Sequence, residues 1–225
     1  VADSQTETRG VATDAARAGV DWIQHASFMS DDDLDAVVKA GTPICPTWTL
    51  VANIAEWGEA FGTPTALRDE FKRELEIGAK VIRRAWEAGV TLLIGTDSGF
   101  AATPYGEWHA RELELFVRLI GMSPMDAIQA ATRNGALTLR NGADVGTLEA
   151  GKLADVLVVD GDPLADIRIL QDRSRLRMIL QGGREVDLSR PWPERKVWAY
   201  ERVMMLSGLM TPQTVAARAG GAGPR

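Results

Sequence analysis

The sequence contains a single cysteine, Cys45, among its 225 residues. An internal disulfide framework is therefore excluded, and an oxidising compartment is not required. No apolar run approaches the roughly 20 residues that cross a bilayer, and no basic-then-apolar signal segment stands at the start. We therefore expect a cytoplasmic protein without a membrane partner.

Clusters of lysine and arginine are also missing, and the net charge is −6. This balance argues against a nucleic-acid partner. No GxGxxG or GxxxxGK[ST] loop follows any apolar run. A phosphate- or nucleotide-binding α/β domain, one alternative for this chain, is disfavoured because it would need such a glycine cradle.

Three amphipathic stretches end in Ala-Gly and are followed at once by a short apolar run: VDWIQ after Gly19, TPICPT after Gly41 and VTLLIG after Gly89. Glycine after a helical pattern stops a helix in the left-handed conformation, so each apolar run is predicted to be a strand. Helices are expected at about 30–40, 64–88, 106–121 and 123–131. The alternation predicts an α/β fold with a parallel sheet.

Capping residues mark the starts of these helices. Ser30 with Asp33 three positions on, Pro64, and Ser123 followed by Pro124 are typical of helix N-termini. From about Gly146 the chain changes to short strands and turns, with a hairpin expected at Gly182-Gly183.

Residues 190–225 complete the expected organisation. Val197, Tyr200, Val203 and Met204 have helical spacing, and we expect the closing AGGAGPR to be disordered.

Reactive side-chain types follow three of the predicted strands. His25 comes after VDWIQ, Thr47 and Thr49 after TPICP, and Asp97 after VTLLIG. Loops that leave the carboxyl ends of parallel strands share one face of the sheet, so these residues should meet at one rim. Histidine and aspartate also bind metals, which makes a divalent cation a reasonable hypothesis.

Each candidate has a plainer interpretation as well. His25 could be a partly buried histidine bonded to a neighbouring carbonyl, and Asp97 in TDSG could fix an Asx turn. His109 is expected on a helix, where nearby charges would form a solvated face: Glu107, Arg111 and Glu112. Cys45 is interpreted as a small core residue.

Seven tryptophans are expected mainly to pack helices. Trp22 and Trp48 flank the expected rim, so they could instead line a pocket.

Four runs together resemble the C-terminal half of an amidohydrolase-superfamily enzyme: AGVDWIQHA, GVTLLIGTDSG, HARELELFVRLIGMSPMDAIQAATRNGA and VGTLEAGKLADVLVVDGDPL. The likeness is greatest to the imidazolonepropionase-like and Xaa-Pro dipeptidase-like branch. It implies that residues 1–145 form the C-terminal part of a (β/α)8 TIM-like barrel. Residues 146–189 would then be part of a small β-sandwich, and residues 190–225 a C-terminal extension.

The resemblance also implies a metal-dependent hydrolase that cleaves a C–N bond in a small amide, dipeptide or cyclic amide. Its cofactor would be a divalent metal, Zn²⁺ as one or two ions, that activates water. His25 matches the sixth-strand metal ligand, and Asp97 the eighth-strand ligand and catalytic residue. His109 matches the histidine of the family's H-x-x-E-L helix. With Thr49 and Tyr105, it is assigned to substrate binding or to support of the site.

Two family features differ in this chain. No His-x-His pair occurs, and Asp3-Ser4-Gln5-Thr6 stands where the branch reads His-x-Gln-Thr, so Asp3 occupies the place of a histidine ligand. A carboxylate can bind the same metals. The alternative is a catalytically inactive relative kept for binding or scaffolding, which would hold little zinc.

A complete barrel of this kind needs about 250 residues, whereas this chain offers three βα units and the trace of a fourth. Half a barrel leaves unpaired strand edges. We therefore expect the chain alone to be unstable, oligomeric or in need of an N-terminal half. A sharp, monomeric two-state unfolding transition of residues 1–225 would contradict this.

Overall fold

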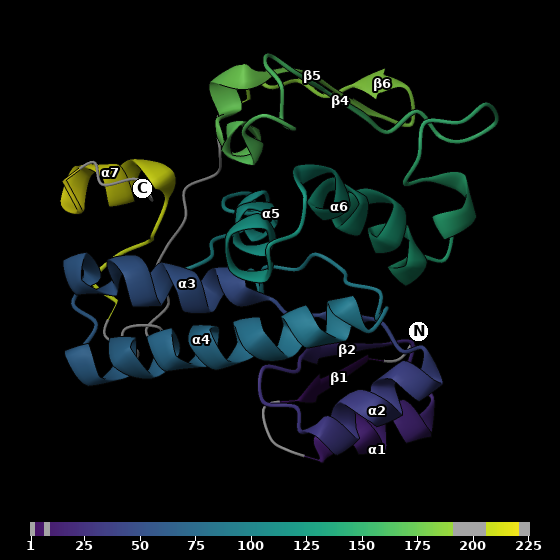
Figure 1. Cartoon of the computed structure of the whole chain (residues 1–225). Helices are drawn as coiled ribbons and strands as arrows, with labels where there is room; N and C mark the ends of the chain where they lie inside the picture. The colour runs from purple at the N-terminus through teal and green to yellow at the C-terminus, as the bar shows by residue number, and fades with distance from the viewer. Residues whose placement is uncertain (1–2, 7–9, 191–205, 221–225) are drawn as a thin grey trace.

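A computed structural model of the chain describes residues 3–6, 10–190 and 206–220, with backbone only in the first segment. The N-terminal layer is a parallel sheet in the order β1-β2-β3, with strands Asp3–Thr6, Trp22–His25 and Ile44–Cys45 (Figure 1). A fourth line of chain joins beside β3, where Leu92 forms a parallel bridge to Ile44. The predicted parallel sheet is confirmed.

The predicted strand VTLLIG contributes only this one bridge. Asn134 Nδ2 donates to the Leu92 carbonyl at 3.0 Å, so a side chain bonds the strand where a further strand would pair. The ladder is therefore short on that side, although the direction and neighbour of the segment are as predicted.

Helices α1 (Val11–Ala18) and α2 (Asp31–Ala40) cover one face of the sheet (Figure 1). The long helix α4 (Thr65–Glu87) follows Pro64, close to its predicted bounds. The glycines after these three helices have left-handed φ angles of 73° at Gly19, 67° at Gly41 and 90° at Gly89. The Ala-Gly pattern is thus confirmed as a series of helix stops.

The predicted cap of α2 is a full capping box between Ser30 and Asp33. Asp33 is completely buried, and its carboxylate also accepts from Gly10 N and from the backbone and hydroxyl of Thr13. Although burial opposes it, hydrogen bonds from Thr13, Gly10 and Ser30 hold the pKa of Asp33 well below its usual range. One side chain therefore joins the starts of α1 and α2.

Replacing this carboxylate should destabilise the N-terminal layer. Asp33→Ala is expected to lower the free energy of unfolding by about 3 kcal/mol at neutral pH, because it leaves several buried donors without an acceptor. Since folding lowers the pKa of Asp33, its stabilisation is present above the unfolded value of about 3.9 and is lost as the pH falls below it. Urea unfolding at neutral pH and at a pH below the unfolded pKa measures the effect. The exposed substitution Asp35→Ala is the control. Equal losses of unfolding free energy in the two variants at neutral pH would contradict the prediction.

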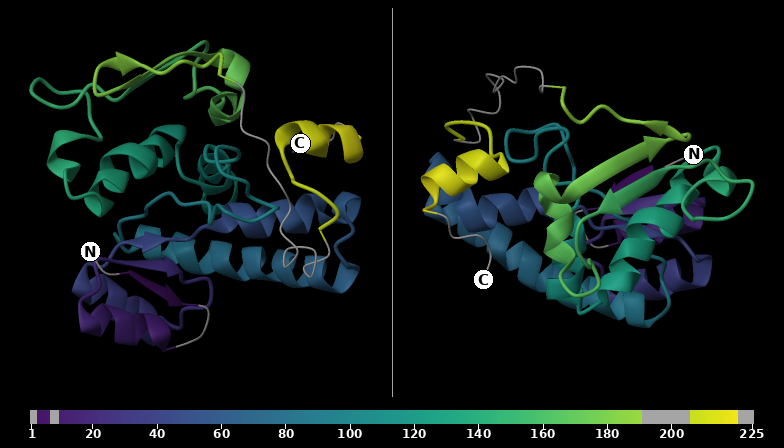
Figure 2. Two further views of the ribbon diagram at one scale, coloured as in Figure 1. Left: turned by 180° about the vertical axis from the view of Figure 1, so that it is seen from behind. Right: turned by 90° about the horizontal axis from the view of Figure 1, so that it is seen from above.

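Helix α3 (Trp48–Trp57), which continues in a 3-10 turn (Gly58–Phe61), was not predicted. Eight of its ten residues are buried. A helix enclosed on nearly all sides lacks the polar face that gives a helical periodicity, and this explains the omission. It packs along α4 in both views of Figure 2.

The helix predicted at 106–121 begins only at Arg111. Trp108 has a φ of 44°, which interrupts the helix before that point. Helix α5 (Arg111–Leu115) then runs into a π-helical turn (Phe116–Ile120). Such turns often occur near functional sites.

The next helix begins where the sequence predicts. Ser123 caps α6 (Pro124–Gln129), and its side chain accepts from Asp126 N. A second π turn (Ala130–Asn134) ends this stretch and supplies the Asn134 amide described above.

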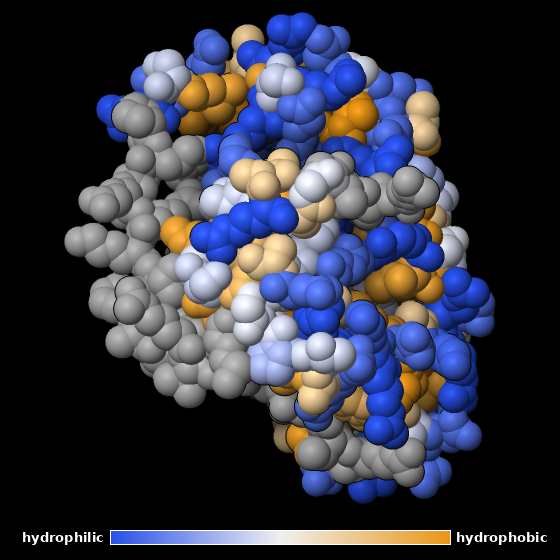
Figure 3. All heavy atoms as spheres, turned by 90° about the vertical axis from the view of Figure 1, so that its left-hand side faces the viewer, coloured by the Kyte–Doolittle hydropathy of each residue, from blue (hydrophilic) through white to orange (hydrophobic). Residues whose placement is uncertain are grey.

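A second, antiparallel sheet has the order β4-β5-β6, with strands Val156–Val159, Leu176–Gln181 and Arg184–Glu185. The Gly182-Gly183 hairpin is confirmed. Figure 2 shows this sheet on the far side of α5 and α6 from the parallel sheet. Several large apolar side chains of this part of the chain are exposed, among them Leu157 and Val158, and Figure 3 shows separate apolar patches between charged groups there.

The C-terminal segment packs beside α3. Helix α7 (Pro212–Arg218) and residues Leu206, Met210 and Val215 share a buried cluster with Phe61 and Trp108. The helix predicted around Val197–Met204 and the tail from 221 lie outside the described residues. None of the helices in the described segments combines the length and the apolar character needed to cross a bilayer.

Candidate active site

The carboxyl ends of β2, β3 and the neighbouring segment around Leu92 lie at one edge of the parallel sheet, which we call the rim. His25 is the last residue of β2, Thr47 lies two residues past β3, and Asp97 follows the segment bridged at Leu92. In the parallel register Ile23 pairs with Ile44, and Ile44 with Leu92. The structure therefore places the predicted histidine, hydroxyl and carboxylate at the same edge.

All three rim residues have left-handed backbones. Their φ angles are 67° at His25, 56° at Thr47 and 49° at Asp97. This region is uncommon for non-glycine residues and an outlier for a β-branched one such as threonine. Each such residue costs on the order of 1–3 kcal/mol, and such strain gathers at functional sites.

His25 is half-buried, and its Nδ1 lies 2.7 Å from Thr47 Oγ1. The ring is thus bonded to a hydroxyl, not to the carbonyl that the plainer interpretation required. Within the described segments, Nε2 has no partner. One ring nitrogen is therefore fixed and the other is left for a ligand.

Asp97 is also half-buried. Its backbone carbonyl accepts from Thr103 Oγ1 at 2.9 Å, but none of the described residues donates to its carboxylate. The Asx turn considered for TDSG is therefore not formed. The carboxylate is held in place by the backbone while both its oxygens stay available.

His109 lies just before α5 and not on the helix. Thr96 Oγ1 is 3.3 Å from its Nδ1, and Gly106 N donates to its Nε2 at 3.1 Å. Desolvation lowers the pKa of His109, against the opposing charge of Glu107. The neutral ring, which accepts at Nε2, therefore connects Thr96 and Gly106, the two ends of the loop that contains Asp97.

The prediction of a solvated helix face beside His109 is wrong. All three charged side chains assigned to it are buried: Glu107, Arg111 and Glu112. Arg111 and Glu112 are enclosed because α5 lies between the parallel sheet layer and the antiparallel sheet (Figure 2).

The other two assigned residues have different surroundings. Thr49 is completely buried in α3, where its hydroxyl donates to Glu112 Oε2 at 2.5 Å. Tyr105 is 69% exposed, and its ring lies against Gly99, two residues after Asp97. Thr49 thus lies behind the rim, whereas Tyr105 covers the outer side of the Asp97 loop.

Neither of the two tryptophans considered for a pocket lines one at the rim. Trp48 is fully buried and packs edge-on against Phe116, with ring centroids 6.3 Å apart. Trp22 begins β2, at the opposite end of the strand from His25. Trp48 is therefore a packing residue, as the plainer interpretation held.

Asp3 opens β1, where its backbone pairs with Trp22, while Thr6 pairs with His25. Its position is therefore at the far end of the strand from the rim, and its side chain lies outside the described atoms.

Glu112 is a site residue that the sequence interpretation missed. Its two oxygens accept from Trp48 N and Thr49 N, each at 2.8 Å. Burial raises the pKa of Glu112 to about 7, although the bonds to Thr49 and Trp48 and the charge of Arg111 lower it in part. The neighbouring charges, Arg111 and Glu114 on the same short helix, gave no local signal that Glu112 is buried.

Cys45 is buried, as predicted. Burial raises the pKa of its thiol to about 12, and the carboxylates of Glu112 and Asp97 add to this. The thiol therefore stays protonated, which excludes it as a nucleophile at neutral pH.

Gly95 lets the Asp97 segment approach β3 closely. A Cβ there would lie 2.5 Å from Cys45 Sγ and 3.0 Å from Thr47 Cγ2. Gly95→Ala is expected to lower the free energy of unfolding by about 1–3 kcal/mol, and Cys45→Ala should recover part of the loss by removing the sulfur. Thermal unfolding measures both. Gly135→Ala, whose Cβ would meet nothing nearer than 3.8 Å, is the control, and a Gly95 variant as stable as this control would disprove the steric argument.

The rim supplies two donor groups of metal-binding type, His25 Nε2 and the Asp97 carboxylate. Zinc in proteins takes three or four protein ligands, and no group of three His, Cys, Asp or Glu side chains within the described segments could hold a metal. These two side chains alone are therefore fewer than a protein zinc site requires.

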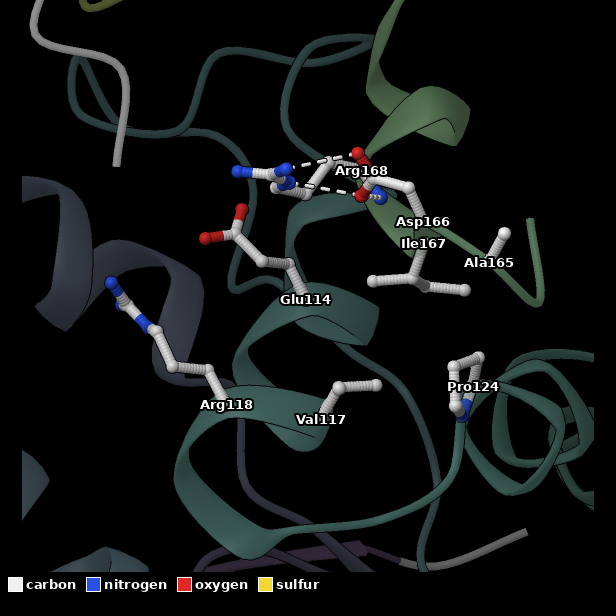
Figure 4. Close-up of a pocket in the computed structure, with 8 residues that line it drawn as sticks. All are labelled: Glu114, Val117, Arg118, Pro124, Ala165, Asp166, Ile167 and Arg168. Atoms are coloured by element: carbon white, nitrogen blue, oxygen red, sulfur yellow. Dashed lines mark hydrogen bonds and ion pairs between the residues drawn. The ribbon is translucent and has the colours of Figure 1, made fainter. Parts of the chain in front are cut away.

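A separate pocket of about 210 Å³ lies between α5, the π turn after it and the 3-10 turn at Ile167–Gln171 (Figure 4). Its lining includes Arg168, which pairs with Asp166, together with Glu114 and Arg118. None of the rim residues lines this pocket, so it is separate from the candidate active site.

Comparison with known proteins gives the same family as the motifs. The chain is 28% identical to ochratoxinase from Aspergillus niger over 172 residues, which cover 76% of this chain and 34% of that protein. It is 30% identical to imidazolonepropionase from Salinispora tropica over 165 residues, 73% of this chain and 37% of the relative. The chain thus spans little more than a third of the length of these curated relatives.

Solved structures agree with these relatives. The crystal structure of a Xaa-Pro dipeptidase with bound methionine in the active site matches with a TM-score of 0.70 and 29% identity, covering 82% of this chain and 44% of that one. The model of the amidohydrolase family matches residues 3–186. The chain therefore belongs to the amidohydrolase family.

Proposed function

We propose that this chain supplies part of the active site of a metal-dependent hydrolase that cleaves C–N bonds in small amides, dipeptides or cyclic amides. The observation that carries the proposal is the shared rim of His25 and Asp97, where an imidazole nitrogen and a carboxylate have no partner among the described residues. The names of the relatives, an ochratoxinase, an imidazolonepropionase and a Xaa-Pro dipeptidase, support this substrate class.

In this proposal, residues 1–145 are the last strands and helices of a (β/α)8 barrel, and 146–189 are part of a small β-sandwich. Residues 190–225 form an extension. The consecutive parallel order of β1, β2, β3 and the Leu92 segment supports the barrel, because neighbouring barrel strands follow one another in sequence. The remaining strands would come from further chain or from a partner copy.

His25 Nε2 and the Asp97 carboxylate would help to hold a divalent metal, Zn²⁺ as one or two ions, which when bound supplies an activated water. Asp97 takes a proton from the attacking water and passes it to the leaving nitrogen. Thr47 fixes the orientation of His25, and His109 holds the loop that carries Asp97. Tyr105 extends beside this loop, where a substrate could contact it.

Metal content and hydrolysis of the complete gene product test this proposal. We expect bound zinc and turnover of Xaa-Pro dipeptides, N-acyl amino acids or cyclic amides, with loss of turnover on chelation and recovery when metal is returned. A folded protein that binds no divalent metal and hydrolyses none of these would overturn it.

A catalytically inactive relative is the second candidate. It is favoured by the absence of three clustered ligand side chains from the described residues. Such a protein would bind amides without converting them. Isothermal calorimetry on the metal-free protein, together with product analysis, separates the two candidates.

A further inference from the structure

Thr47 stands at the N-terminus of α3 but does not cap it. A residue in this position usually has an extended backbone, and its hydroxyl accepts from the second or third helical N–H. Thr47 instead has φ 56° and ψ 43°, and its side chain makes no capping bond. Its hydroxyl is bonded to His25 Nδ1 at 2.7 Å.

Glu112, from α5, takes over the capping of α3. One oxygen accepts from Trp48 N, and the other accepts from Thr49 N and from Thr49 Oγ1. The side chain is fully buried, and 64 residues separate it from the helix start that it caps. The carboxylate therefore satisfies the first two N–H donors of the helix, and the second of them, Thr49 N, is one that a capping threonine would bond.

We infer that Glu112 is a positioning residue for His25: by capping α3 in place of Thr47, it holds Thr47 in the left-handed conformation and leaves the threonine hydroxyl to orient the imidazole. Nδ1–H then donates to Thr47 Oγ1, and Nε2 keeps its lone pair toward the rim. The functional meaning of this orientation rests on the proposed role of His25, but the contacts can be tested without any activity.

The test is nitrogen NMR of the metal-free protein labelled only at its histidines, at a pH well above the ordinary histidine pKa of about 6.5. The chain has two histidines, so a His109→Gln variant assigns both signals. His25 should show the single tautomer with hydrogen on Nδ1. Thr47→Val should abolish this preference and leave a mixture of tautomers.

Glu112→Gln should also replace the single tautomer of His25 by a mixture, because an amide has only one acceptor oxygen and its NH₂ cannot receive the backbone donors. Glu114→Gln is the matched control. Glu114 is also a buried acid on α5, but its carboxylate is bonded to Gln171 and pairs with Arg111, not with the backbone at the start of α3. The control should leave the His25 signals unchanged.

A folded Glu112→Gln protein with unaltered His25 signals would overturn the inference, as would the opposite tautomer in the unsubstituted protein. If Glu112→Gln does not fold, Thr49→Val decides. It removes one bond to the same carboxylate and should shift the His25 tautomers part of the way; no shift would again overturn the inference. Absence of hydrolytic activity would refute the proposed function and leave this result standing.

Discussion

Asp97→Asn is expected to abolish hydrolysis in the complete gene product and to leave the fold intact. An amide is nearly the same size as the carboxylate, and no described group depends on the charged side chain for a hydrogen bond. Unlike the carboxylate, the asparagine amide cannot accept a proton from water at neutral pH. Removal of a general base lowers kcat by roughly 10²–10⁴, and weaker metal binding adds to the loss.

Steady-state kinetics, zinc content and circular dichroism together measure this effect. Asp35→Asn, an exposed change on α2, serves as the control and should retain full activity. Turnover within a few-fold of the unsubstituted protein in the Asp97 variant would remove Asp97 from the mechanism.

Arg111→Ala should give the largest loss of stability. Arg111 is completely buried, pairs with Glu56 at 2.5 Å and stacks over Trp57 at 4.0 Å. Truncating a large, completely buried side chain leaves a cavity and costs about 3–5 kcal/mol. The buried Glu114 carboxylate also loses the guanidinium that lies 3.7 Å from it. Chemical denaturation of the variant measures the loss.

Arg111→Met is the matched comparison. Its side chain fills much of the same volume, and Glu56 keeps Arg118 as a partner at 2.5 Å. We expect a smaller loss than for alanine. Equal stability of the alanine variant and the unsubstituted protein would show that the buried pair makes no net contribution.

Local signals in the sequence predict much of this fold. Glycines after amphipathic stretches and the Ser30 and Ser123 caps act within a few residues, so their effects are visible in the sequence. Helix α3 is different, because it is enclosed by elements from distant parts of the chain and shows no polar face. Its existence depends on packing that a local pattern does not contain.

The candidate site likewise has a part that the sequence predicts and a part that it does not. That His25, Thr47 and Asp97 meet follows from the direction of parallel strands alone. The bond between Thr47 and His25 requires the left-handed turn at Thr47, and that turn is accompanied by Glu112 capping the helix that follows. These contacts join residues 22 and 64 positions apart, and the charged pattern around Glu112 indicated solvent instead of burial.

The segment 206–220 bears on how the protein is handled in the laboratory. Met210 N donates to the Ala101 carbonyl at 2.8 Å, and Trp108 Nε1 donates to the Met210 carbonyl at 2.5 Å, so this segment bonds to both ends of the loop that follows Asp97. The family match ends at residue 186. Trimming the chain to the matched region would release that loop, and an affinity tag is better attached at a distance from this segment.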